Sequence, residues 1–332
     1  MKQLNLAIMG IIALLVLAGC GSGGGGGETT GVAPSTPFLG GSNGLNIEFF
    51  SGEPPNEVTD GGVYDFQAIV RLRNDGEYHI NRDDVSVDLI GFLPEDFGTN
   101  FDDLNNKRPE DDLSARIRDA EGNIQDAIVS EVTFPDYDSY FNFERPITGN
   151  TAFIFRADVC YKYQTKALTR LCVLRDLVNV DNNDVCDPSS TKTIHSSSSP
   201  VQINSFKQTV TGRDKISFSF DVTHTGNSRG SVFKEGDASS PPGDCPKDPR
   251  ERREKESRVL VTVETGLSDL RCVGLNGGTT GYINLVDGRR TVTCIQELDA
   301  GRNDFETNID ITLDFNYLDY TEQEVLVKHM IN

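Results

Sequence analysis

Three short motifs have the residue types and spacing of known catalytic or phosphate-binding sites. Gly40–Gly44 reads G-x-S-x-G, the pattern that presents a nucleophilic serine, here Ser42. That chemistry requires a strand before the serine and a helix after it, whereas a glycine-rich stretch precedes Ser42 and a strand-like segment follows. Gly21–Gly26 matches G-x-G-x-x-G without a preceding strand, and Ser189–Lys192 matches S-x-x-K without a helix. We therefore predict no catalytic residue and no enzymatic activity.

The histidines and carboxylates also lack the spacing of a metal centre. The four histidines are scattered, none lies in H-E-x-x-H or beside a cysteine, and the cysteines include no C-x-x-C pair. Acidic stretches such as Asp181–Asp184 and Glu110–Asp112 carry oxygen ligands that suit calcium. They lack the Asp-x-Asp-x-Asp-Gly loop, so calcium binding stays an open alternative to a solvated acidic surface. We predict no metal site and no cofactor.

The first twenty residues have the pattern of an export signal. The apolar run Leu6–Ala18 has 13 residues, within the roughly 7–15 of a signal-peptide core and short of the about 20 that span a bilayer. It ends in Leu17–Cys20, Leu-Ala-Gly-Cys, which resembles the lipobox of prokaryotic lipoproteins. The resemblance implies that residues 1–19 are a signal peptide and that Cys20 carries a diacylglycerol. An ordinary secretory signal followed by a chance cysteine is the alternative.

The stretch after the lipobox and the overall charge are consistent with the extracytoplasmic location that an export signal implies. Residues 20–44 are rich in Gly, Ser and Pro, which predicts a flexible tether behind the lipid. The net charge is −20, with 31 Lys and Arg against 51 Asp and Glu. This charge argues against binding nucleic acid or an anionic surface through bulk electrostatics. We predict an extracytoplasmic protein, anchored by lipid to a membrane at the cell surface.

Six cysteines remain once the lipid site is set aside, and an even number in an exported chain predicts up to three disulfides. A turn at Thr165–Ala167 between two short strands would place Cys160 opposite Cys172, close enough to bond. Cys272 and Cys294 flank a hairpin and are predicted to pair in the same way.

The last two cysteines lie outside the predicted hairpins. Cys186 lies near a predicted domain junction, and Cys245 lies in a polar insertion at residues 234–257. Their pairing would fix the insertion across the junction. The competing pair Cys172–Cys186 closes a short loop and stays open as an alternative.

Apolar residues of the remaining chain alternate with period two, as in strands with one buried face, and several segments recur. Val63–Gly76 and Lys215–Gly226 both read as a strand ending in a turn, with turn glycines 150 residues apart. Asp158–Tyr161 and Asp314–Tyr317 match at an offset of 156. The repeat predicts an all-β chain with two tandem immunoglobulin-like antiparallel β-sandwich domains, with chance alternation as the alternative. The predicted domains cover residues 45–198 and 199–332, the second containing the insertion 234–257.

Each predicted domain closes with two strands joined by a turn. Phe153–Tyr163 is followed by Leu168–Val173 in the first, and Ile309–Tyr317 by Glu324–Lys328 in the second. Asp-Gly between alternating strands is a strong hairpin signal. We expect hairpins at Arg116–Val132, around Glu121-Gly122-Asn123, and at Tyr282–Cys294, around Asp287-Gly288.

One strand and its turn resemble a known family. Val70–Gly76 has the pattern apolar-x-apolar-x-Asn-x-Gly, which resembles adhesion-related Ig-like repeats of bacterial and archaeal surface proteins. His224-Thr225-Gly226 is a looser version of the same turn. The order of segments as a whole is similar to that of lipid-anchored archaeal surface proteins. The resemblance implies a location and a fold, and no activity.

These observations predict a lipid-anchored surface protein with a structural or adhesive role. Its predicted partners are the membrane, through the lipid, and another surface protein or an envelope polymer, with no nucleic acid. A first alternative is a ligand-capture protein, with a cleft between the domains lined by Phe92, Tyr137 and Tyr140. A second alternative is an envelope hydrolase, which needs a pocket with converging polar groups.

Overall fold

The computed structural model describes residues 36–181, 184–236 and 243–330, and these residues confirm the predicted all-β class. The signal segment, Cys20 and the tether up to residue 35 lie outside the described residues. One described α-helix, α2 (Pro249–Lys255), accompanies the strands. Three short 3-10 helices are η1 (Arg82–Asp84), η2 (Pro94–Phe97) and η3 (Asp102–Leu104).

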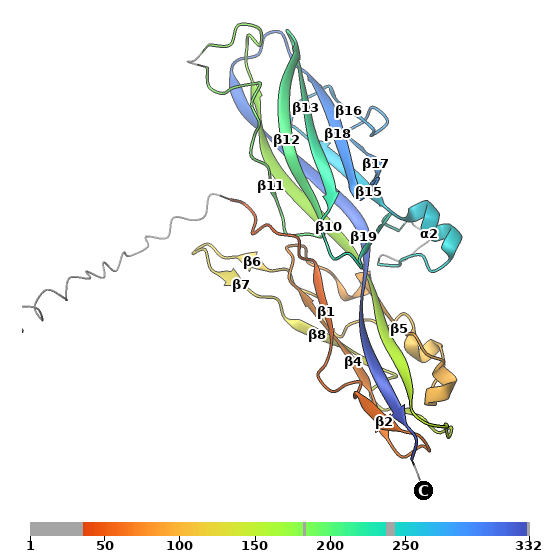
Figure 1. Ribbon diagram of the computed structural model, residues 1–332. Coiled ribbons are helices and arrows are strands. Elements are labelled where there is room, and N and C mark those ends of the chain that lie inside the picture. The colour runs from red at the N-terminus through yellow and green to blue at the C-terminus, as the bar shows by residue number, and fades with distance from the viewer. Residues whose placement is uncertain (1–35, 182–183, 237–242, 331–332) are drawn as a thin grey trace, which may run out of the picture. The chain divides into compact units, whose positions relative to one another are not determined.

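Two long strands organise the fold. β10 (Thr151–Val173) and β19 (Phe305–Lys328) pair antiparallel along the whole of β10 (Figure 1). The prediction that each region is two strands joined by a turn is therefore wrong. Gln164–Leu168 contains no Gly or Pro, and its alternation of buried and less buried residues continues that of the flanking residues. The backbone groups of this segment bond to β19, so no turn is required.

The first half of the chain completes one pair of packed sheets. β5 (Val85–Ile90) adds antiparallel to β10, and β2 (Glu57–Thr59) adds parallel to β19. The facing sheet has the order β1-β4-β8, with bounds Leu45–Phe49, Ala68–Asn74 and Val129–Phe134. Inward residues of both sheets, such as Leu72, Val87 and Val325, belong to one hydrophobic core.

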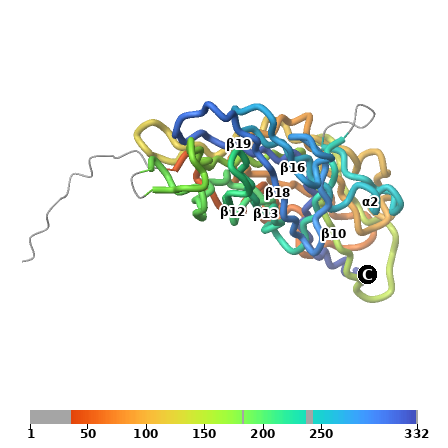
Figure 2. Tube along the Cα trace, turned by 90° about the horizontal axis from the view of Figure 1, so that it is seen from above, coloured from red at the N-terminus to blue at the C-terminus, as the bar shows by residue number. Residues whose placement is uncertain are grey.

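The second half uses the other ends of the same two strands. Here β15 (Arg258–Glu264), β17 (Thr280–Asn284), β14 (Ser231–Phe233) and β11 (His195–Ser196) extend the sheet of β10 and β19. A separate sheet has the order β12-β13-β18-β16, and β12, β13 and β18 lie side by side in Figure 2. Its strands are Val201–Gly212, Lys215–His224, Arg289–Glu297 and Leu270–Val273.

Segments matched in the sequence take corresponding places. β5 pairs with β10 as β15 pairs with β19, and Tyr161 lies directly opposite Tyr317 in the central ladder. However, strands assigned to separate domains, 45–198 and 199–332, share one eight-stranded sheet. The described residues belong to one compact unit.

The predicted hairpins have different outcomes. The first exists as β6 (Ile117–Arg118) paired with β7 (Ile124–Gln125). At the second, Asp287 and Gly288 form the expected turn with φ of 50° and 73°. The strands on either side then diverge, because β17 pairs with β15 and β18 pairs with β13 and β16. A last short pair is β3 (Asp65–Phe66) with β9 (Phe141–Asn142).

Candidate interaction site

Two of the three motifs, around Ser42 and Ser189, lie in a bend and a turn, and Gly21–Gly26 lies outside the described residues. Ser42 precedes β1 rather than a helix. The amide of Ser189 donates to the carboxylate of Asp187, a local turn contact of 2.8 Å. His224 is hydrogen-bonded to the Tyr317 hydroxyl and His329 to the Asp60 carboxylate. Within the described residues, no group of three His, Cys, Asp or Glu side chains is placed to hold a metal ion.

Among the residues that the structure describes, no helix is long and apolar enough to cross a bilayer.

The six cysteines form three disulfides, two of them in pairings considered from the sequence. Cys272–Cys294 is confirmed and joins facing residues of β16 and β18. The alternative pair Cys172–Cys186 is also confirmed. The predictions Cys160–Cys172 and Cys186–Cys245 are wrong, because Cys160 bonds to Cys245. Twelve residues of one continuous strand separate Cys160 from Cys172, about 40 Å at the usual rise per residue.

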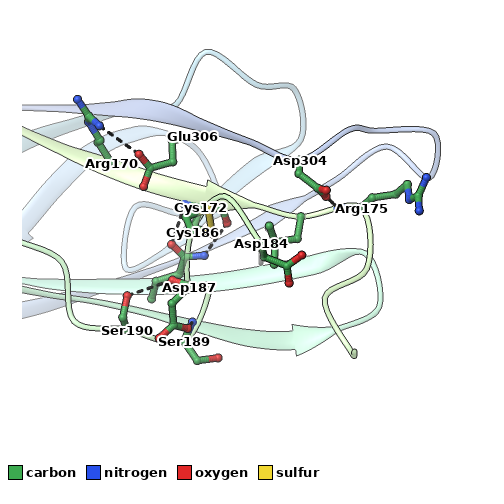
Figure 3. The surroundings of a disulfide bond; sticks show 12 residues. Arg170, Cys172, Arg175, Asp184, Cys186, Asp187, Ser189, Ser190, Asp304 and Glu306 are labelled. Carbon is green, nitrogen blue, oxygen red and sulfur yellow. Dashed lines mark hydrogen bonds and ion pairs between the residues drawn. A yellow bond between two sulfur atoms is a disulfide. The ribbon is translucent and has the colours of Figure 1, made fainter. Parts of the chain in front are cut away.

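The Cys172–Cys186 disulfide fixes a loop to the end of β10 (Figure 3). Nearby, Arg170 pairs with Glu306 at 3.1 Å, and the backbone amide of Arg175 donates to Asp304. The buried amide of Gln208 accepts from the Cys172 N–H at 3.0 Å and donates to its carbonyl at 2.7 Å. The contacts of Gln208 satisfy backbone hydrogen-bonding groups at the end of β10, so this side chain has a structural role.

The Cys160–Cys245 disulfide attaches the polar insertion to β10, with a cavity of about 310 Å³ beside it. Asp88 and Asp158 line the cavity from facing positions on β5 and β10. Burial raises the pKa of Asp158 above its ordinary value, although the Arg156 guanidinium at 2.5 Å opposes this. Lys247 of the insertion pairs with Asp88 at 2.8 Å. Both carboxylates therefore already have internal cationic partners.

The aromatic residues predicted to line an interdomain cleft do not come together in one. Phe92 stacks on Phe155 with ring centroids 4.1 Å apart and packs against the core. Tyr137 and Tyr140 are 61% and 53% exposed. They belong to residues 135–140, here named the tyrosine loop, which connects β8 to β9.

Buried aromatic residues hold both ends of the tyrosine loop. Phe134 precedes it and Phe141 follows it, and both are completely buried. Phe141 pairs with Phe66 across β9 and β3, with ring centroids 5.3 Å apart. The loop therefore leaves and re-enters the core at fixed points.

Polar contacts fix the loop between these ends. The Gln67 side-chain nitrogen lies 2.8 Å from the Asp136 carbonyl oxygen, 3.2 Å from that of Tyr137 and 2.9 Å from that of Ser139. The Ser139 amide also donates to the Asp136 carbonyl at 3.0 Å, which closes a turn. Lys107 pairs with the Asp136 carboxylate at 2.7 Å. Three main-chain carbonyls and one amide of the loop thus have internal partners, while both tyrosine side chains are exposed.

A held loop with exposed tyrosines is well suited to binding another macromolecule. Tyr offers a large amphipathic contact area at low cost in side-chain entropy, and Ser adds adaptable hydrogen bonding. Asp138 and Ser139 are exposed between the two rings. The sequence alone identified the two tyrosines but not Gln67, whose only signal was a polar amide in an otherwise strand-like stretch.

Comparison with protein-family models and with curated protein sequences finds no match for this chain.

Proposed function

We propose that this chain is an extracytoplasmic surface protein, held to a membrane by a lipid on Cys20, with a structural or adhesive role. In this proposal the tyrosine loop is the contact site for another surface protein. The fold acts as a disulfide-linked support, and no catalytic role is assigned.

The observation that carries the proposal is the fixed display of Tyr137 and Tyr140. A loop held by three contacts from one amide loses little freedom when a partner binds, so less of the binding energy is spent on ordering. Tyrosines are also enriched among the residues that dominate binding energies at interfaces. The disulfides suit an oxidising compartment.

The binding role is tested with a photoreactive amino acid at position 137 on intact cells, followed by binding assays with the purified captured protein. Tyr137→Ala/Tyr140→Ala is expected to weaken binding at least tenfold. Gln67→Ala should weaken it less and should speed hydrogen exchange of the loop amides. Tyr282→Ala, on β17, is the matched control. Unchanged affinity in the double variant would remove the loop from the proposal.

The anchor is tested separately. Cys20→Ser is expected to abolish lipid labelling and release the protein from the membrane fraction, with all three disulfides retained. Continued membrane association of the unlabelled variant would contradict anchoring through Cys20.

A further inference from the structure

Two neighbouring cavities flank Pro37, which lines both. The first, of about 450 Å³, is formed by residues before β1, residues after β4, the β6 strand and β10. The second, of about 420 Å³, lies along β10 and β19 beside β11. Both adjoin residues 36–44, the end of the predicted tether, which the structure describes as packed on the fold.

The cationic side chains around these cavities contrast with the rest of the chain. Arg116, Arg118 and Lys166 line the first cavity with a single carboxylate, Glu77. Arg170 and Lys192 line the second, with Glu306. Together these give five cations against two carboxylates, in a chain whose net charge is −20. The two cavities are therefore a local basic site on an acidic protein.

Existing contacts occupy the two carboxylates. Glu77 accepts hydrogen bonds from the backbone amides of Leu39, Gly40 and Ser198 at 2.8, 2.9 and 2.6 Å. Glu306 pairs with Arg170 at 3.1 Å. Neither acid forms an ion pair with a cation of the first cavity, although Glu77 keeps its negative charge there.

Two cations of the first cavity form no ion pair within the described part of the chain, although Asp314 interacts with one of them, Lys166, at longer range. Arg118 makes only long contacts, 3.4 Å, to the carbonyl and hydroxyl oxygens of Thr36. Lys166 is exposed. Across the ranges that the structure describes, no carboxylate forms an ion pair with either side chain within 4.0 Å. Arg116 has one such partner, Asp126, at 3.2 Å.

We propose that the cavities beside Pro37 form a binding site for a ligand that carries phosphate groups. A phosphate group supplies up to two negative charges and three acceptor oxygens. The planar guanidinium of Arg118 suits bidentate contact with such a group, and Lys166 adds a compact charge. The chemistry is shared by soluble glycerol phosphates and by phospholipid headgroups.

The test uses full-length Cys20→Ser protein, so that no lipid on Cys20 can itself insert into vesicles. Calorimetric titration with glycerol phosphate probes the soluble source. Sedimentation with vesicles of phosphatidylglycerol and phosphatidylcholine, against phosphatidylcholine alone, probes the headgroup source. Arg118→Gln/Lys166→Gln is expected to weaken binding at least tenfold. Because the contacts are between charges near the surface, added salt should also weaken it.

Arg253→Gln/Arg271→Gln is the matched control, since both cations are exposed and neither lines either cavity. Circular dichroism of both double variants checks that the fold is retained. Glycerol phosphate binding that is lost only in the first variant supports the site with a soluble source. Vesicle binding alone, lost in the same way, supports the site with a lipid source. Absence of binding in both assays, or equal binding by both variants, would overturn the proposal.

Discussion

Removing the Cys160–Cys245 disulfide is expected to destabilise the protein more than removing Cys172–Cys186. The bonded residues are 85 apart in the first pair and 14 apart in the second. In the chain-entropy model, a disulfide stabilises by restricting the unfolded chain, and its effect grows with the logarithm of the closed loop. The stabilisation is then about 4.6 kcal/mol for the long loop and about 3.0 kcal/mol for the short one.

The short loop lies inside the long one, so it shortens the free length that the Cys160–Cys245 bond closes. This nesting lowers the effect of removing either disulfide by the same amount, about 0.15 kcal/mol, because the dependence is logarithmic. The two corrections cancel in the comparison, so the expected difference between the two disulfides is about 1.6 kcal/mol.

The comparison uses Cys160→Ala/Cys245→Ala and Cys172→Ala/Cys186→Ala, each with the other two disulfides intact. Urea unfolding is followed by circular dichroism, because the chain contains no tryptophan to report by fluorescence. The reasoning is refuted if the Cys172→Ala/Cys186→Ala protein is the less stable of the two. Peptide mapping of the unreduced protein checks the pairings themselves.

Two further predictions concern stability. Backbone amides of Met330 and Ile147, together with the His329 side chain, lower the pKa of Asp60 from 3.8 to about 2. The stabilisation from these contacts is complete above the ordinary pKa and is lost as pH falls toward 2. The urea midpoint of Asp60→Asn should therefore lie below wild type at pH 5, with a gap that narrows toward pH 2. A constant gap would contradict this. Gly76→Ala should cost about 1–3 kcal/mol, since its Cβ would overlap the Tyr163 hydroxyl and lie 2.8 Å from the Asn43 carbonyl oxygen. Gly301→Ala, with no neighbour within 4 Å, should change the midpoint little, and equal effects would sink the steric argument.

The strand pattern was predictable from the sequence, whereas strand length was not. Period-two alternation marks β10 and β19 correctly. Strands usually have about 3–10 residues, so the sequence predicts two shorter strands in place of each. Only the long-range pairing decides that Thr165 and Lys166 continue a ladder to Leu313 and Thr312. The incorrect Cys160–Cys172 pair followed directly from that division.

Local turn chemistry was more predictable than the partners of the strands beside it. Asp287-Gly288 forms its turn because both residues adopt positive φ, as expected for this dipeptide. The assignment of β17 and β18 to different sheets depends on residues far along the chain. Likewise, an exposed Tyr137 and a partly buried Phe92 differ in their neighbours in the folded chain, which residue type and spacing do not encode.

The sharing of β19 between both halves has a consequence for biogenesis. Residues 321–327 pair with residues 151–157, and Val325 and Val327 fill the core of the first half. Translation makes these residues after every other strand of that half. Until then the Thr151–Ala157 edge lacks its partner, and unpaired edges template aggregation. Closure of the first half must therefore wait for synthesis of the second, which favours chaperone protection of the emerging chain.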